Sequence, residues 1–289
     1  MTDAVLPLVS VIIPSYNHAH FLPRALQSVQ RQSWRNWEVI VVDNHSTDNT
    51  DEIMQAWLGD RVRLFKIHNN GVIAASRNKG VHEARGEWIA FLDSDDWWTA
   101  DKLDRSMHLA LSGADVVFHD LAMVGTDGRS RPWRRSRSRA VAHPAYDDLV
   151  SNGCALPNSS VVVRKARLDA IGGLCEDREL VGWEDFNSWL RLAQSGCRFA
   201  RLSGSHGYYW VGGGNVSNPH RTLSNIDTFL ARHVGDPAAT PWWCHYSRAV
   251  AYKALGQPEQ VRLSFAAAWR ARPNALNRLR IVCKWLLTR

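Results

Sequence analysis

The chain has 289 residues, 45% hydrophobic content and a net charge of +7, which describes a globular protein with one large core or a core and a small appendage. Its five cysteines are scattered without a CxxC pair, which argues against a zinc site or a disulfide framework. No window supplies the roughly 20 mostly apolar residues of a membrane-spanning helix, and no nucleic-acid-binding motif accompanies the positive charge, so we expect no span and no nucleic-acid partner.

The first half of the chain alternates apolar strand-like runs with helix-like runs. A β-branched run is followed by a turn with the sequence Pro14-Ser15-Tyr16-Asn17 and by a helix with Pro23 near its start. The same alternation continues to residue 92 and predicts a doubly wound parallel sheet. The expected strands are residues 9–13, 38–43, 61–67 and 88–92. Helices separate them, and the second of these helices is expected to end at Gly59.

The second half is less regular and predicts mixed strand directions. We expect a helix at about 99–112, strands at 115–118 and 159–163, and a helix at 184–194. The stretch from Tyr246 to Ala275 has the small-residue spacing of one tetratricopeptide-like helix pair, and a last helix follows Pro273. The expected division is a domain at 1–218, with halves 1–104 and 105–218, and a helical extension at 219–289.

Carboxylates stand at three places in chain order. Asp43 ends one expected strand, Asp93-Ser94-Asp95 ends another, and Glu184-Asp185 opens an expected helix. Open α/β sheets bind ligands at the carboxyl ends of parallel strands, and carboxylates with phosphate oxygens are the ligands that magnesium and manganese prefer. The order therefore favours an enzyme that handles a nucleotide and a metal, although an isolated DxD motif can also solvate a loop or cap a helix.

The segment VSVIIPSYNHAHFLPRALQSVQRQSWRNWEVIVVDNHSTDNT, with SRNKG, FLDSDD and GWEDFNSWLRLAQSG further on, resembles the family 2 glycosyltransferases of bacterial surface-glycan type. The resemblance runs from Val9 to about Asp104, recurs at Glu184, and fades after Asn218. It implies an α/β GT-A (Rossmann-like) fold, a mixed sheet flanked by helices. One departure is that Asp43-Asn44-His45-Ser46 stands where the family usually has Asp-Asp-Gly-Ser.

By this resemblance the donor site uses the turn at Pro14, Ser15, Tyr16 and Asn17, with Tyr16 packed on the base and Asp43 accepting a hydrogen bond from it. Arg77 would reach the ribose or diphosphate. Simpler explanations stay open: Tyr16 covers the sheet edge, Asp43 caps a turn, and Arg77 is an exposed helix cation.

The resemblance also implies the metal and catalytic residues. Asp95 would bind manganese or magnesium, and Asp93 would bind the ribose or a metal-bound water, with Ser94 between them. Asp185 would be the general base beside Glu184, and both acids could instead serve the positive end of their helix. His206 and Asn215 would add metal or phosphate contacts, and Trp183 with Glu184 would contact the acceptor.

The activity so implied is metal-dependent, inverting and non-processive, because the Gln-x-x-Arg-Trp signature of processive synthases is absent. The donor would be a nucleotide sugar, most simply UDP-linked, and the acceptor a glycan or lipid-linked glycan. Two alternatives are a nucleotidyltransferase acting on sugar phosphates and a non-catalytic carbohydrate-binding relative. The first should show a glycine- and lysine-rich loop near the N-terminus, which the turn at Pro14 lacks.

The charge is concentrated in two acid-free stretches that could attract anionic surfaces. From Gln260 onward the sequence has no acid, and Leu276, Leu279, Val282 and Leu286 recur at helical spacing beside Trp285. Since Met1-Thr2-Asp3 lacks the basic residues of a secretion signal, we expect a cytoplasmic protein held peripherally on an anionic membrane surface. The alternative is that this apolar face packs on the core. The other stretch contains Arg129, Arg131, Arg134, Arg135, Arg137 and Arg139.

Overall fold

The computed structural model describes residues 6–136, 138–212, 218–271 and 273–286. The chain forms two compact units. The first contains Met1–Val141, Ala155–Glu176 and Glu184–Gly214. The second contains Ala142–Cys154, Asp177–Trp183 and Asn215–Arg289, so it takes in two short segments from earlier in the chain besides the C-terminal region.

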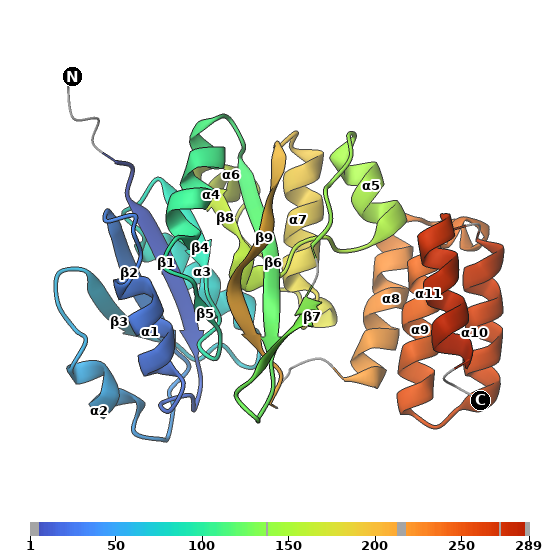
Figure 1. Cartoon of the computed structure of the whole chain (residues 1–289), viewed down its shortest axis with the longest axis horizontal. Helices are drawn as coiled ribbons and strands as arrows, with labels where there is room; N and C mark the ends of the chain where they lie inside the picture. Colours follow the sequence, from blue (N-terminus) through green and yellow to red (C-terminus); the bar gives the residue numbers. More distant parts are fainter. Residues whose placement is uncertain (1–5, 137, 213–217, 272, 287–289) are drawn as a thin grey trace. The chain divides into compact units, whose positions relative to one another are not determined.

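The first unit is built on one mixed sheet, which in the described part of the chain has nine strands in the order β3-β2-β1-β4-β8-β6-β9-β5, with β7 paired to β6 (Figure 1). The first four strands, β1 to β4, are parallel, as the alternating sequence predicts. β8 is antiparallel to β4 and β6, which confirms the mixed directions expected beyond residue 104. The strands are β1 (Val9–Ser15), β2 (Trp37–Asp43), β3 (Val62–Lys66), β4 (Trp88–Phe91), β5 (Trp97–Trp98), β6 (Val116–Val124), β7 (Ser130–Ser136), β8 (Val162–Arg164) and β9 (Phe199–Trp210).

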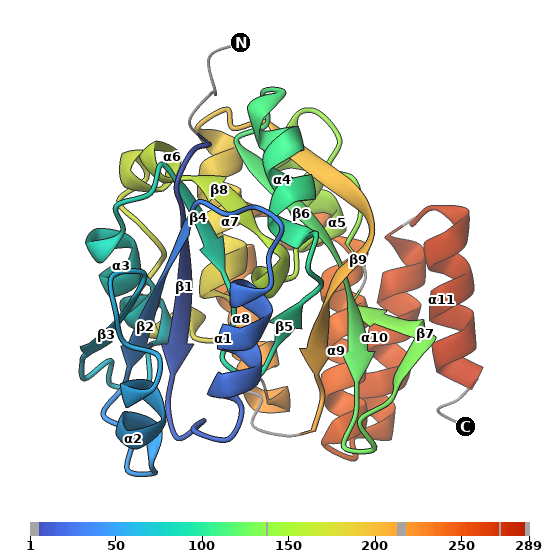
Figure 2. The same ribbon diagram turned by 60° about the vertical axis from the view of Figure 1, so that its left-hand side comes forward.

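Helices cover both faces of the parallel strands, as Figures 1 and 2 show. The apolar stripes of α1 (Leu22–Gln30) and α4 (Lys102–Leu111) share one buried cluster with alternate residues of β1 and β2, and α2 (Thr50–Gln55) adds Met54 to it. On the opposite face lie α3 (Ile73–Glu83) and α7 (Glu184–Gln194). A Cβ at Gly80 would stand 2.4 Å from the Ile12 side chain, so only glycine lets α3 approach this closely.

Strand register brings the functional segments to one edge. Ser15 is paired with Asp43, and Ile12 with Phe91, so β1, β2 and β4 end together and release their loops on the same side. Asp93 lies two residues beyond β4. This is the edge at which parallel α/β sheets bind ligands.

Two details of the second half differ from the expectation. The strand expected at 159–163 begins later, because Asn158–Ser160 forms a 3₁₀ turn that is closed by the Ser160 amide bonding the Pro157 carbonyl at 3.0 Å. The long strand β9 was not predicted, since its glycines and charged residues hide the alternation of a strand. The antiparallel strands β6 and β7 are joined by a hairpin turn, with Gly128 at φ +68°.

The second unit is helical. It contains α5 (Ala145–Asn152), α8 (Pro219–His233), α9 (Trp242–Ala254), α10 (Pro258–Arg270) and α11 (Ala275–Leu286). α9 and α10 occupy the place of the predicted helix pair, and their contact continues to α11 through a core of Ala249, Val261, Phe265, Ala268 and Ile281. Among the described residues, none of the helices combines the length and apolarity that a membrane crossing requires.

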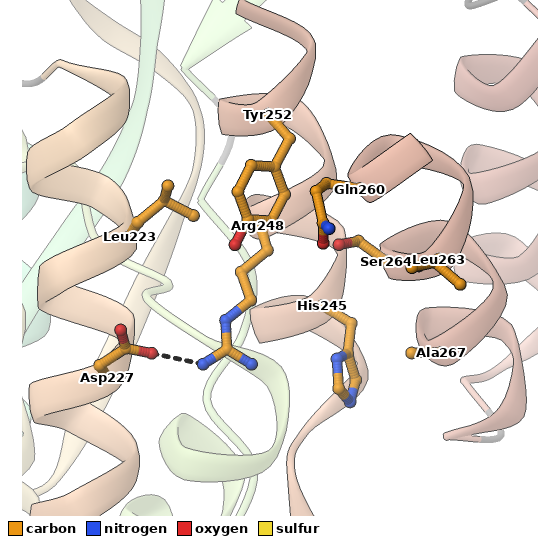
Figure 3. Close-up of a pocket in the computed structure, with 9 residues that line it drawn as sticks. All are labelled: Leu223, Asp227, His245, Arg248, Tyr252, Gln260, Leu263, Ser264 and Ala267. Carbon is orange, nitrogen blue, oxygen red and sulfur yellow. Dashed lines mark hydrogen bonds and ion pairs between the residues drawn. The ribbon is translucent and has the colours of Figure 1, made fainter. Parts of the chain in front are cut away.

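A groove of about 290 Å³ lies along α8, α9 and α10. Figure 3 shows Arg248 reaching across it to Asp227, with Tyr252 and Gln260 on its wall. The groove belongs to the second unit and contains none of the acidic motifs singled out in the sequence.

Candidate active site

The loop after β2 is held by Asp43, whose side chain is fully buried. Its Oδ2 accepts a hydrogen bond from the Ser46 amide at 3.0 Å, and its Oδ1 accepts one from the Ser46 hydroxyl. Asn17, at φ 52°, bonds the same loop through its own amide and through an Oδ1 that accepts from the Thr47 amide at 2.8 Å. Asp43 therefore does cap the loop, as the simpler explanation holds, and this capping fixes the loop next to the turn at Asn17.

The turn before this loop presents Tyr16 to solvent, with 53% of the side chain exposed. Pro14 and Ser15 end β1 and are buried beneath it. An exposed ring above a buried turn offers an aromatic face to a ligand. Among the contacts of the described residues, none packs the Tyr16 ring against the sheet.

The DxD motif follows β4 in a tight turn. The Asp96 amide bonds the Asp93 carbonyl at 3.0 Å, and the Ser94 hydroxyl lies 2.7 Å from Nδ1 of His18. Burial, together with the nearby carboxylate of Asp93, raises the pKa of Asp95 to about 6. Two partly buried carboxylates that repel each other are a donor set suited to a hard divalent cation, which would neutralise both. The residues thus fit a manganese or magnesium ion.

Arg77 connects the DxD motif to the Glu184-Asp185 motif. Its side chain is only 5% exposed, and its guanidinium donates to Oδ1 of Asp93 at 2.7 Å and to Oε1 of Glu184 at 3.1 Å. Burial by itself lowers the pKa of Arg77, but the two carboxylates outweigh it and raise the pKa above its ordinary value. Arg77 is therefore a buried connector and not the exposed helix cation of the simpler explanation.

Asn158 completes this cluster. When its amide is oriented to satisfy its neighbours, the oxygen accepts from Nη2 of Arg77 at 3.1 Å and from Nε at 3.3 Å. The 3₁₀ turn at Asn158–Ser160 also carries Ser159, whose hydroxyl accepts from the Asp93 amide at 3.1 Å. Sequence reasoning missed both residues, because a polar pair before a short strand has no distinctive spacing.

Asp185 lies in the first turn of α7, next to the paired Glu184. Burial and the neighbouring charge of Glu184 raise the pKa of Asp185 to about 7, against the opposing effect of Arg77. Oδ1 of Asp185 accepts a hydrogen bond from the Phe186 amide at 2.6 Å. A carboxylate with a raised pKa beside an acid motif is suited to accept a proton near neutral pH.

His206 has its contacts elsewhere in the first unit. Nδ1 of His206 lies 3.5 Å from Asp101, and its Nε2 lies 3.0 Å from the Ser203 carbonyl oxygen. Among the described residues no three His, Cys, Asp and Glu side chains gather as a metal site, so His206 is not brought together with the DxD acids. Trp183 belongs to the second unit, where its ring lies 5.7 Å from that of Trp243, and Asn215 lies outside the described residues.

The sequence matches the family model described as glycosyl transferase family 2 over residues 10–160, which is more than half of the chain. The chain belongs to this family. Among curated relatives, a glycosyltransferase of Escherichia coli, the UDP-Glc:alpha-D-GlcNAc-diphosphoundecaprenol beta-1,3-glucosyltransferase WfgD, is 39% identical over 192 residues, 64% of this chain and 69% of that protein. Two other curated relatives are matched over only 46% and 36% of their own length.

Solved glycosyltransferases share the fold. Residues 1–349 of S. aureus TarS in complex with UDP-GlcNAc match with a TM-score of 0.60 and 20% identity, covering 92% of this family member and 81% of that chain. The mannosyltransferase PcManGT from Pyrobaculum calidifontis, in complex with GDP-Man and Mn²⁺, matches with a TM-score of 0.59 and 22% identity, covering 97% and 80%. These likenesses confirm the expected GT-A fold.

Proposed function

We propose that this family 2 member is an inverting, non-processive glycosyltransferase of surface-glycan biosynthesis. It transfers one sugar from a UDP-sugar to a hydroxyl of a lipid-linked glycan. The E. coli relative is named for UDP-glucose and a diphosphoundecaprenol-linked acceptor, and the TarS structure contains UDP-GlcNAc, which supports this choice of donor and acceptor over a GDP-linked donor.

The Arg77 cluster carries the proposal. A single buried guanidinium bonds Asp93 of the donor-side motif and Glu184 of the catalytic motif, so the two motifs form one cluster. We assign the general base to Asp185, because its neighbour Glu184 is engaged by Arg77 while Asp185 has a raised pKa. Asp185 would take the proton of the acceptor hydroxyl as that oxygen attacks the anomeric carbon from the face opposite the leaving diphosphate.

On the donor side, Tyr16 would stack on the base and the Asp43 loop would bind its polar edge, with Pro14, Ser15 and Asn17 fixing the turn. Asp95 and Asp93 would hold manganese or magnesium, as the Mn²⁺ in the archaeal mannosyltransferase structure supports. A bound divalent ion would stabilise the negative charge that develops on the leaving nucleoside diphosphate.

The test is a transfer assay with the full chain. The purified protein is incubated with manganese and a panel of nucleotide sugars, with and without a GlcNAc-diphospho-lipid acceptor, and released nucleoside diphosphate is measured. We expect release from a UDP-sugar that depends on the acceptor, and a product whose anomeric configuration, read by proton NMR, is inverted. A retained configuration, or sugar binding without any release, would reject the proposed reaction.

We also propose a cytoplasmic location with peripheral contact to an anionic membrane. Half of the exposed large hydrophobic side chains of the described residues lie on α10 and α11, with Trp269 45%, Leu276 76% and Leu279 61% exposed. The acid-free sequence around them provides charge complementarity to anionic lipids. Of the α11 face expected from sequence, Val282 is partly buried and Ile281 makes the packing contact instead.

Anionic vesicles test this location. Each basic residue near such a surface contributes about 1 kcal/mol, and the exposed leucines add apolar insertion. We expect co-sedimentation with phosphatidylglycerol vesicles that falls with salt, and a marked loss in the double variant Leu276→Glu with Leu279→Glu. Leu111, 55% exposed on α4 of the first unit, gives the matched control Leu111→Glu. If the wild type, the double variant and Leu111→Glu bind the vesicles equally, α11 is excluded as the membrane contact.

A further inference from the structure

The segment between β1 and α1 and the first turn of α1 each contact the DxD motif. Nδ1 of His18 lies 2.7 Å from the hydroxyl of Ser94, the middle residue of the motif. In the first turn of α1, Nη2 of Arg24 donates to the main-chain carbonyl of Asp95 at 2.9 Å. Neither side chain has a role in the reaction described above, and both bonds reach the motif without using its carboxylates.

Arg24 is itself held by aromatic rings. Its guanidinium carbon lies 3.6 Å from the centroid of the Trp97 ring, and 5.4 Å and 5.5 Å from those of Trp210 and Phe21. Such cation–π contacts fix a planar guanidinium in one orientation. The Trp210 amide also donates to Oδ1 of Asp96 at 2.9 Å, so the rings around Arg24 are tied to the same loop.

The chain just beyond the end of α1 is bonded to the segment that follows the motif. Nε2 of Gln32 donates to the Thr99 carbonyl at 2.7 Å, and Oε1 of Gln32 accepts from the Leu103 amide at 2.8 Å. Gln32 is fully buried. Hydrogen bonds from Arg24, near the start of α1, and from Gln32, just after its end, therefore hold this helix against the DxD loop and its continuation.

We propose that His18 and Arg24 are positioning residues that hold the Ser94 side chain and the Asp95 main chain, so that the Asp93 and Asp95 carboxylates face the donor diphosphate and its cation as a fixed pair. They act through the motif and are not themselves ligands. This inference rests on the proposed metal-dependent function. Groups that orient the ligands of a metal typically change metal affinity or activity by about 10–100-fold when they are removed.

Arg24→Lys is the most informative variant. Lysine keeps the positive charge but lacks the flat fork that stacks on Trp97 while donating to the Asp95 carbonyl. His18→Gln removes the imidazole contact with Ser94 and serves as the second variant. Arg31, exposed just after the same helix, provides the matched control Arg31→Lys.

The experiment combines two measurements on the full chain. Manganese affinity is measured by electron paramagnetic resonance in the presence of UDP, and hydrogen exchange of residues 93–98 is measured without metal. We expect Arg24→Lys and His18→Gln to bind manganese about tenfold more weakly and to exchange faster at these amides, while Arg31→Lys matches the wild type. Thermal unfolding of each variant establishes that it is folded.

The outcomes separate this inference from the function on which it rests. If Arg24→Lys and His18→Gln bind manganese as tightly as the wild type and exchange at the same rate, or if they only lower the unfolding temperature, the positioning role is wrong. If the wild type itself binds no manganese with UDP, the metal dependence fails, and the exchange rates alone then decide whether the two side chains hold the loop.

Discussion

Replacing Arg77 by methionine removes the cation that joins the two acidic motifs. The side chain of Arg77 is 5% exposed and that of Glu184 is 7% exposed, so the variant leaves a buried carboxylate without its ion pair. Breaking a buried pair in this way typically costs about 3–5 kcal/mol. Because Asp93 is 27% exposed and water can solvate it, the cost falls mainly on Glu184, and we expect a loss of about 3 kcal/mol.

Urea unfolding, followed by tryptophan fluorescence, measures this loss of stability. A control is Arg105→Met, which breaks an ion pair on α4 whose partners, Arg105 and Asp101, are 55% and 43% exposed. An exposed pair of this kind contributes below about 1 kcal/mol. Both changes remove one arginine, but Arg77→Met breaks two salt bridges and Arg105→Met breaks one. The difference between the two variants therefore reports the burial of the Glu184 pair together with a smaller contribution from the more exposed pair with Asp93.

A compensating variant makes the test of Arg77 more specific. Combining Arg77→Met with Glu184→Gln replaces the carboxylate that has lost its ion pair with Arg77 by a neutral amide. The double variant should therefore recover part of the lost stability. An Arg77→Met protein that unfolds at the same urea concentration as Arg105→Met would refute the reasoning. A double variant less stable than Arg77→Met alone would show that the Glu184 carboxylate has another partner, and that this partner contributes more to stability than the neutral amide recovers.

The remaining predictions concern the acids. Asp185→Asn should lower kcat by about 10²–10⁴-fold and leave the donor Kd nearly unchanged, as isothermal titration with the UDP-sugar can measure. Since Asp185 must be ionised to act and its pKa is raised to about 7, kcat/KM should fall as pH decreases through that value. A raised pKa also means that folding favours protonated Asp185, so wild-type stability should decrease relative to Asp185→Asn as pH rises towards and through 7. Asp95→Asn should weaken donor binding and abolish the sensitivity of that binding to EDTA.

Most of the first half of the fold could be predicted from the sequence, because the local apolar patterns there agree with the tertiary structure. The strands around Val11 and Val39 are buried on both faces, and their sequences are continuous apolar runs. β9 could not be found this way, since much of it lies half-exposed and its residues carry charge and glycine. Its pairing with β6 is determined by packing that no local pattern encodes.

The candidate site was predicted unevenly for a similar reason. Motif acids such as Asp95 and Asp185 stand at element ends, where spacing reveals them. The partners of Arg77 lie 16 and 107 residues away in sequence, so a helix arginine gave no sign that it bridges two motifs. The prediction for His206 stays a prediction, and its contact with Asp101 could not be read from the sequence, since a lone histidine carries no information about which acid it will contact.

In the proposed reaction, the Arg77 contact would let the two adjacent carboxylates serve different purposes. If Glu184 and Asp185 shared one environment, neither would be favoured as the proposed base. The ion pair holds Glu184 against Arg77, and the negative charge of Glu184 helps to raise the pKa of Asp185. Because Arg77 is bonded to Asp93 as well, a cation at the DxD motif would compete for the same carboxylate oxygens. Donor binding and the proton affinity of the base are therefore expected to depend on each other through this one side chain.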